Sequence, residues 1–233
     1  MKDGMPICLG YLAVSFAFGM KVCAGGLPVW LAGLISLSNL TSAGQFAGTN
    51  LILSGAAYAE IFFTTFIINL RYFLMAMSLS QKLDGSFNTF RRMSMAHGVT
   101  DEIFAVAVGR KGLLSPVYMC GLITTPVLGW TAGTVLGGIF ANVLPDSIVG
   151  AFGIALYAMF IAIFLPPAKK EKPVLYAVLI AVAISTAFAY IPGLKEISSG
   201  WVIIIATVAS AGLMATFFPI GQSQADAAKG GEV

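Results

Sequence analysis

An amide and a cationic side chain interrupt an apolar stretch of this sequence. The segment FIINLRYFLMAMSLS, residues 66–80, carries Asn69 and Arg71 near its centre. At about 1.5 Å per helical residue, Arg71 lies about 15 Å before Lys82, which follows the segment. A side chain cannot reach the lipid headgroups over that distance, so a charge at this depth should face the protein interior with a partner. Guanidinium binds carboxylates in a bidentate fork, so Arg71 is either the anchor of an anionic ligand or half of an internal ion pair that fixes packing.

The candidate partners are the one adjacent pair of acidic residues in the sequence, Asp101–Glu102, in MSMAHGVTDEIFAVAV. On a continuous helix Ser94, His97 and Asp101 would share one face, and Glu102 would lie on the adjoining face. A carboxylate held between apolar surroundings and an arginine can take up and release a proton, or bind an ammonium group. Alternatively, the pair pins Arg71 in place, or begins a half-helix whose dipole favours acids. His97 is the only histidine, and one histidine without a second ligand does not predict a metal site.

A third polar stretch is SLSNLTSAGQFAGTN, residues 36–50. On a continuous helix four polar residues would share a face: Ser38, Ser42, Gln45 and Thr49. Gly44 and Gly48 favour close contact between helices, to which the hydroxyls would add hydrogen bonds. The primary amide of Gln45 is costly in hydrocarbon unless it is hydrogen-bonded, so it suits either a neighbouring helix or a polar substrate.

The composition defines the elements that must position these side chains. The chain has 233 residues, of which 58% are hydrophobic and 10% charged, with a mean hydropathy of +0.90. Soluble domains carry about 25% charged residues, so these values exclude a soluble globule. They predict an all-α integral membrane protein, a polytopic bundle of about six to eight membrane elements. The apolar segments are Met5–Val22, Pro28–Leu53, Tyr58–Leu79, Met93–Val108, Leu113–Val143, Ile148–Leu165, Val174–Ile191 and Trp201–Phe218.

The basic residues place three connections on the cytoplasmic side by the positive-inside rule. These residues are Lys82, Arg91 and Arg92, then Arg110 and Lys111, then Lys169, Lys170 and Lys172. This assignment is incompatible with a full crossing by 93–108, which is also short for a span. We therefore expect one or two discontinuous or re-entrant helices, at 93–108 and at 28–53, around a protein-lined cavity. Residues 1–220 are expected to form a single transmembrane transport domain, and residues 221–233 a short, polar, disordered tail.

Other features indicate packing and exclude several functions. A stripe of glycines at every fourth position, Gly129, Gly133 and Gly137, predicts close helix packing. The cysteines are scattered and form neither a disulfide framework nor a metal site: Cys8, Cys23 and Cys120. No phosphate-binding loop is present, and no cofactor is expected. An intramembrane enzyme would need a positioned nucleophile and base, but His97 is the sole imidazole and no serine lies in a nucleophile-elbow pattern, so we expect no enzyme.

Three motifs together resemble one family. SAGQFAG at Ser42–Gly48, NLRYFLMAMSL at Asn69–Leu79 and TDEIFAVA at Thr100–Ala107 occur in the order found in AzlC-type branched-chain amino-acid permeases. The resemblance spans roughly Gly4 to Phe218. It implies an exporter in the bacterial cytoplasmic (inner) membrane, multi-pass and paired with a small AzlD-type membrane subunit. The run SMAHGV before Thr100 departs from the bulky apolar residues that members more often carry there.

The residues and the resemblance lead to one expected mechanism. Arg71 holds the substrate carboxylate, and Asp101, with Glu102 second, meets the ammonium group or a coupling proton. The polar part of the path is lined by Gln45, Asn69, Ser42 and Thr100. Phe46 and Phe104 accommodate the side chain of valine, leucine, isoleucine or methionine, and proton-coupled alternating access drives export. The alternatives are a secondary transporter of a different small solute and a non-transporting membrane scaffold.

Overall fold

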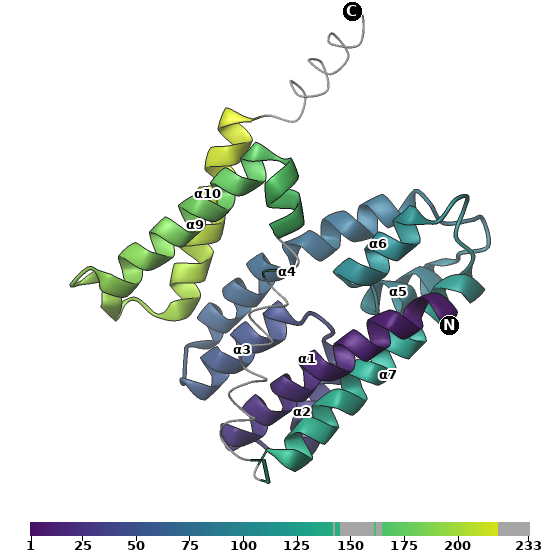
Figure 1. Cartoon of the computed structure of the whole chain (residues 1–233), viewed down its shortest axis with the longest axis horizontal. Coiled ribbons are helices and arrows are strands. Elements are labelled where there is room, and N and C mark those ends of the chain that lie inside the picture. The colour runs from purple at the N-terminus through teal and green to yellow at the C-terminus, as the bar shows by residue number, and fades with distance from the viewer. Residues whose placement is uncertain (142, 145–160, 162–164, 219–233) are drawn as a thin grey trace, which may run out of the picture. The chain divides into compact units, whose positions relative to one another are not determined.

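The structure, a computed structural model, describes residues 1–141, 143–144, 161 and 165–218 (Figure 1). Within these residues the regular structure is helical, apart from an isolated β-bridge between Leu83 and Leu114, which confirms the all-α class. The predicted tail lies outside the described residues, as does the predicted segment 148–165 except for residues 161 and 165. In chain order the elements are η1 Lys2–Gly4, α1 Met5–Ala24, α2 Val29–Ser38, α3 Ala43–Leu53, α4 Tyr58–Ser80, α5 Thr89–His97, α6 Asp101–Gly109, α7 Pro116–Phe140, α9 Lys172–Tyr190, η2 Leu194–Glu196 and α10 Ser199–Phe217.

Five helices of the described chain are long and apolar enough to cross a membrane. They are α4, α7, α9, α10 and the continuous helix formed by η1 and α1. Each of the five matches an apolar segment predicted from the sequence, and the protein is a polytopic helical membrane protein. The predicted segments 28–53 and 93–108 are each divided into two shorter helices.

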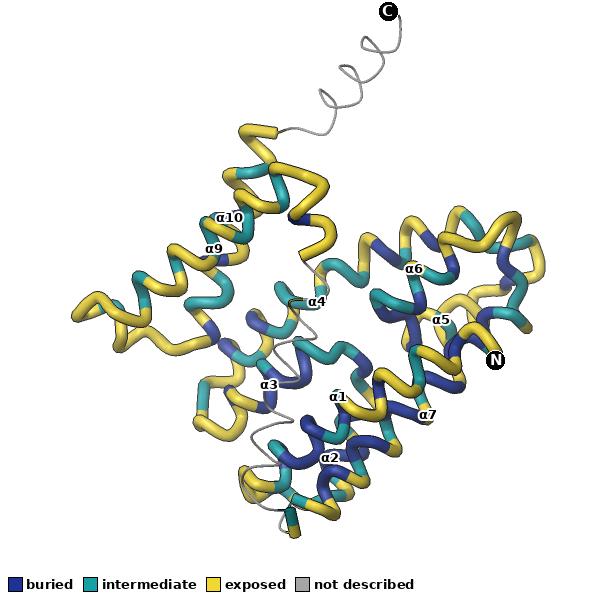
Figure 2. Tube along the Cα trace, in the orientation of Figure 1, coloured by how far each residue is buried: buried dark blue, intermediate teal, exposed yellow. Residues whose placement is uncertain are grey.

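The chain divides into two compact units. The first comprises Met1–Leu53 and Ile68–Met159, and therefore contains α1, α2, α3, α5, α6, α7 and the later part of α4. The second comprises Ser54–Ile67 and Phe160–Val233, with the beginning of α4 and with α9 and α10. Buried residues concentrate on α1, α3 and α7 of the first unit, whereas α9 is intermediate or exposed along its whole length (Figure 2).

The most extensive helix contact of the first unit is that between α1 and α7, which lie side by side (Figure 1). The glycine stripe of α7 makes this contact, because no side chain separates its backbone from α1. A Cβ atom on Gly129 would lie 2.6 Å from the Cys8 Sγ, and one on Gly133 would lie 2.5 Å from the Leu12 carbonyl oxygen. A Cβ atom on Gly137 would overlap the α1 backbone in the same way. The predicted role of the stripe in close packing is confirmed.

The first interrupted element is α2–α3. The helix ends at Ser38, the next residue has an extended backbone, and Ser42 adopts a φ of 44°. Asparagine, threonine and serine in the sequence NLTS favour such a break, because their side chains compete for backbone hydrogen bonds. The predicted single polar face through positions 38, 42, 45 and 49 is therefore wrong, since Ser38 and Gln45 belong to different helices.

The second interrupted element is α5–α6, as the short segment 93–108 predicts. The helix α5 ends at His97 and α6 begins at Asp101, so the predicted shared face of Ser94, His97 and Asp101 is wrong. Gly98 lies in the break, where a Cβ atom would overlap the side chain of Ile123 on α7. The His97 Nε2 lies 2.9 Å from the carbonyl oxygen of Leu37 in the last turn of α2, so the two interruptions are adjacent.

The second unit has its own polar anchor. Glu60, near the start of α4, is 6% exposed, and its Oε1 accepts a hydrogen bond of 3.1 Å from the backbone N–H of Gly200. The Ser198 hydroxyl donates a second hydrogen bond to the same oxygen. The carboxylate thereby satisfies donors at the beginning of α10, where the helix dipole also favours a negative charge.

Candidate functional site

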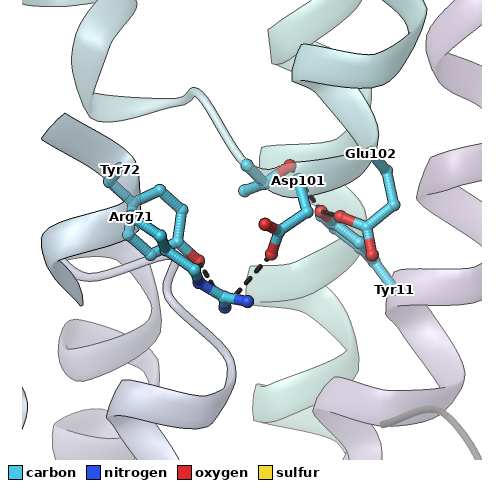
Figure 3. A network of polar contacts seen from close by, with 6 residues as sticks. Tyr11, Arg71, Tyr72, Asp101 and Glu102 are labelled. Carbon is cyan, nitrogen blue, oxygen red and sulfur yellow. Dashed lines mark hydrogen bonds and ion pairs between the residues drawn. The ribbon is translucent and has the colours of Figure 1, made fainter. Parts of the chain in front are cut away.

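An ion pair between Arg71 of α4 and Asp101 of α6 is the centre of the site (Figure 3). The Arg71 Nη2 lies 3.1 Å from the Asp101 Oδ2. The two side chains keep 37% and 29% of their surface exposed within the chain, so the pair is accessible and not sealed in the core. Both residues belong to the first unit. The structure thus brings together the deep cation and the first of the two acids that the sequence singles out.

Tyr72 adds a second contact to the guanidinium group. The Arg71 Nη2 lies 3.4 Å from the Tyr72 hydroxyl oxygen, and the Arg71 Cζ lies 5.1 Å from the centre of the Tyr72 ring. A cation over an aromatic face gains electrostatic stabilisation and loses freedom of movement. The Arg71 Nε, in contrast, is buried and makes no hydrogen bond within the described chain.

The second acid has different partners. Glu102 Oε2 accepts a hydrogen bond from the Tyr11 hydroxyl, on α1, and the same hydroxyl oxygen lies 2.5 Å from the Thr100 Oγ1. Tyr11 is 7% exposed, and its ring packs edge-on against Trp130 of α7 with the ring centres 5.2 Å apart. Figure 3 shows Asp101 directed toward Arg71 and Glu102 directed toward Tyr11. The two adjacent carboxylates thus point toward different partners.

The local backbone explains why these acids lie where they do. Thr100 is the N-cap of α6 in extended conformation, with φ −118° and ψ 174°, and Asp101 and Glu102 fill the first helical turn. Carboxylates are favoured there because the first backbone N–H groups of a helix carry a partial positive charge. The opposite end of α6 is held by Lys82, whose Nζ donates to the carbonyl oxygen of Ala107 at 3.3 Å and to those of Val108 and Arg110.

Lys82 thereby anchors α6 to the segment after α4. The backbone reinforces the contact, because the Leu114 N–H donates to the Lys82 carbonyl at 2.8 Å and the Asp84 N–H donates to the Leu114 carbonyl at 3.0 Å. A cation at the C-terminal end of a helix complements its dipole and its free carbonyl groups. One end of α6 is therefore held at Lys82, while the other end presents Asp101 and Glu102 to the site.

Gln45 belongs to a separate buried network in the first unit. Its Nε2 donates to the Ser36 Oγ at 3.2 Å, and Ser36 shares a hydrogen bond of 2.6 Å with Thr134 of α7. The Thr134 hydroxyl also bonds to the Trp130 carbonyl oxygen at 3.0 Å. No hydrogen bond joins Gln45 to Arg71 within the described chain, although its Oε1 is buried without a partner.

Asn69 and Ser42 lie at the α2–α3 interruption. A Cβ atom on Gly44 would lie 2.7 Å from the Asn69 Oδ1, which places the amide against the start of α3. The Asn69 Oδ1, the Ser42 Oγ and the Thr41 Oγ1 are buried and make no hydrogen bond within the described chain. Such atoms are rare in folded proteins, and each is free to bind water or a polar ligand.

The two predicted wall residues occupy different surroundings. Phe46 is 5% exposed and packs edge-on against Phe18 of α1, with the ring centres 5.1 Å apart. Phe104 is partly buried and packs against the apolar cluster of α6 and α7. It follows Asp101 by three residues, so the two side chains lie on the same side of α6.

Sequence reasoning missed the aromatic hydroxyls and the buried hydroxyls of α2 and α7: Tyr11, Tyr72, Ser36 and Thr134. A tyrosine within an apolar membrane helix is a usable signal, because its hydroxyl requires a partner. Among the described residues no group of three or more potential metal ligands occurs, and the three cysteines are free thiols.

A family model described as "AzlC protein" matches residues 6–144, which include every residue of the site. The inner membrane protein YgaZ of Escherichia coli is 25% identical over 178 residues, which cover 73% of each chain. An uncharacterized membrane protein of Archaeoglobus fulgidus is 31% identical over 166 residues, 70% of this chain and 72% of that one. The branched-chain amino acid transport protein AzlC of Bacillus subtilis is 24% identical over 171 residues, 72% of this chain and 66% of that one. No solved structure matches the chain.

Proposed function

The chain belongs to the AzlC family, and we propose that it exports branched-chain and related apolar amino acids by proton-coupled secondary transport. It is a multi-pass protein of the cell membrane, with five described helices suited to crossing the bilayer. The name of the Bacillus subtilis relative supports amino acids of this class as substrates. Valine, leucine, isoleucine and methionine share an apolar side chain with a carboxylate and an ammonium group, and the site must hold both charges.

The exposed ion pair of Arg71 and Asp101 carries the proposal. A zwitterion inserted between them gives the guanidinium a carboxylate and gives Asp101 an ammonium group, so each charge keeps an opposite partner. A ligand with only one charge would leave either the guanidinium or the carboxylate unpaired. Because breaking a partly exposed pair without replacement costs about 1–3 kcal/mol, the arrangement favours ligands that carry both charges.

The remaining polar groups fit the same substrate. The unpartnered oxygens of Asn69 and Ser42, together with Gln45, supply acceptors and hydroxyls along the interruption of α2–α3. Phe104 offers an apolar surface one turn after Asp101. Interrupted helices in transporters place substrates at helix ends and move as elements of alternating access, and α2–α3 and α5–α6 supply such elements here.

The proposal includes a small AzlD-type membrane subunit. The helix α9 has no buried residue within the chain, and α10 has few, so their apolar surfaces are open to lipid or to another membrane helix. Co-purification of the two chains from a membrane would show whether the subunit binds. Flux measured with and without it would show whether transport requires it.

Transport in proteoliposomes tests the function. The purified chain, alone and with the small subunit, is expected to move labelled valine, leucine or methionine across the membrane, outward when driven in oriented vesicles. Arg71→Lys keeps the charge and loses the fork, and should weaken apparent affinity by about 10- to 100-fold, from about 1.5–3 kcal/mol for a charged hydrogen bond.

Arg91→Lys is the matched control, since Arg91 is exposed and contacts the Ser86 carbonyl oxygen outside the site. It should transport as the wild type does. Unchanged affinity in Arg71→Lys would refute the anchor. Flux of another solute in place of these amino acids would assign the site to a different substrate, and absence of any flux would leave a membrane scaffold.

A further inference from the structure

The two adjacent carboxylates of the site differ in their partners, of which one is charged and the other is neutral. Asp101 faces a guanidinium, whereas within the described chain Glu102 is hydrogen-bonded to the neutral hydroxyl of Tyr11, which in turn contacts Thr100. Resting on the proposed function, we propose that Glu102, and not Asp101, carries the coupling proton, with Tyr11 and Thr100 as a hydroxyl relay that satisfies both of its protonation states. This assignment reverses the order expected from the sequence, which placed Asp101 first.

The hydroxyl geometry makes the two states possible. The Tyr11 oxygen is within hydrogen-bond distance of both Glu102 Oε2 and Thr100 Oγ1, but a phenol has one proton and can donate only once. When Glu102 is ionised, Tyr11 donates to the carboxylate and accepts from the Thr100 hydroxyl. When Glu102 binds a proton, it donates to the Tyr11 oxygen and Tyr11 donates to Thr100. The hydrogen bonds of both protonation states can therefore form by rotation of two hydroxyl groups, without movement of the backbone.

The charges that face Glu102 lead to the same assignment. The ionisable groups near Glu102 are Tyr11 of α1, Tyr72 of α4 and Asp101 of its own helix. Arg71 of α4 lies beyond Asp101. One guanidinium and two carboxylates leave one negative charge, which a single proton neutralises. A net charge inside a membrane protein is costly, so the cluster favours one bound proton. Asp101 has its compensating cation at 3.1 Å, although burial raises the pKa of its carboxyl more than Arg71 lowers it, and Glu102 has no compensating cation within the described chain.

Two modes of transport separate substrate binding from proton coupling. In the first, labelled valine exchanges with unlabelled valine across the vesicle membrane without a pH gradient. In the second, a pH gradient drives net flux. Glu102→Gln keeps the shape of a permanently protonated acid, so net flux should lose its response to the gradient, and exchange should be affected less than net flux.

Tyr11→Phe tests the relay by a readout that packing alone would not change. The ring and its contact with Trp130 remain, but both states of Glu102 lose a hydrogen-bond partner. The loss is larger for the ionised state, because its hydrogen bond is charge-assisted, so the pH midpoint of net flux should move upward. Glu60→Gln is the matched control, because Glu60 is likewise a glutamate that accepts from hydroxyl and backbone donors, and glutamine keeps the acceptor for Ser198 and Gly200. It should leave both modes unchanged.

The outcomes distinguish this proposal from the proposed function. If the wild type shows neither exchange nor net flux of the labelled amino acids, the proposed function falls, and this inference with it. If the wild type shows both and Glu102→Gln still responds to the gradient, the proton assignment is overturned and the function stands. Loss of the response in Glu60→Gln as well would also overturn it.

Infrared spectroscopy tests the assignment on protein that need not transport. A protonated carboxylic acid has a carbonyl stretching band that an ionised carboxylate lacks. The pH midpoint of this band should move in Tyr11→Phe, because the Tyr11 hydroxyl contacts Glu102, whereas Asp101 is paired with Arg71. An unchanged midpoint in Tyr11→Phe would contradict the proposal, even if Glu102→Gln fails to fold.

Discussion

The ion pair of Arg71 and Asp101 allows a test that separates a role in packing from a role in substrate binding. We consider three variants: Arg71→Gln, Asp101→Asn and the double variant with both changes. Each single variant leaves one charge without its partner at 3.1 Å. The double variant leaves two neutral amides in the same place, which can bond to each other.

The expected magnitudes follow from the exposure of the pair. Removing one partner of a fully buried pair costs about 3–5 kcal/mol, whereas an exposed pair contributes about 0.2–1 kcal/mol. With exposed fractions of 37% and 29%, the two side chains lie between these limits. We expect each single variant to lower the free energy of unfolding by about 1–3 kcal/mol, and the double variant to recover most of that loss.

Unfolding and valine exchange are measured on the same purified preparations. The double variant should be nearly as stable as the wild type, yet inactive, because two amides offer neither charge to a zwitterion. A double variant that exchanges valine as the wild type does would show that the pair only fixes packing. Additive losses of stability in the three variants would show that the two side chains do not interact.

Two further predictions concern the elements that position the site. Lys82→Met removes the hydrogen bonds to the end of α6, so it should lower the free energy of unfolding by about 1–2 kcal/mol and weaken transport. Lys82→Arg should restore both stability and transport. A melting temperature of Lys82→Met equal to that of the wild type would contradict the anchoring role of Lys82. Gly133→Ala should cost about 1–3 kcal/mol, because its Cβ would lie 2.5 Å from the Leu12 carbonyl oxygen. Gly10→Ala, where a Cβ meets nothing within 4 Å, should melt at the wild-type temperature or slightly above, and equal melting of the two alanine variants would refute the close contact of α1 and α7.

The sequence predicts most of the fold because its physical signals are strong. Long apolar runs predict the crossing helices, and glycine at every fourth residue predicts a close helix contact, for which the structure supplies the partner α1. The short segment before Arg110 and the positions of the basic residues indicate a broken helix at 93–108, which the structure confirms. In contrast, reading 36–50 as one helix put Ser42 and Gln45 on the face of Ser38, because periodicity does not reveal a residue with positive φ such as Ser42.

The site is predicted in part. A cation at the depth of Arg71 requires an acid, and Asp101–Glu102 is the one adjacent acidic pair, so their association follows from charge and solvation. Which of the two acids meets Arg71 depends on where α6 begins and on the partner that α1 supplies, and neither is local in sequence. Tyr11 contacts Glu102 across 91 positions of the chain, so no spacing rule could find it.

Competition for binding most directly tests the claim that the Arg71–Asp101 pair receives a zwitterion. Labelled valine bound to the purified chain is challenged with unlabelled valine, with isobutylamine, which lacks the carboxylate, and with isovalerate, which lacks the ammonium group. We predict that valine displaces the label. Each analogue should need a concentration at least about 100-fold higher for the same displacement, since each loses a charged contact of about 3 kcal/mol. Displacement by either analogue at concentrations similar to those of valine would contradict the account.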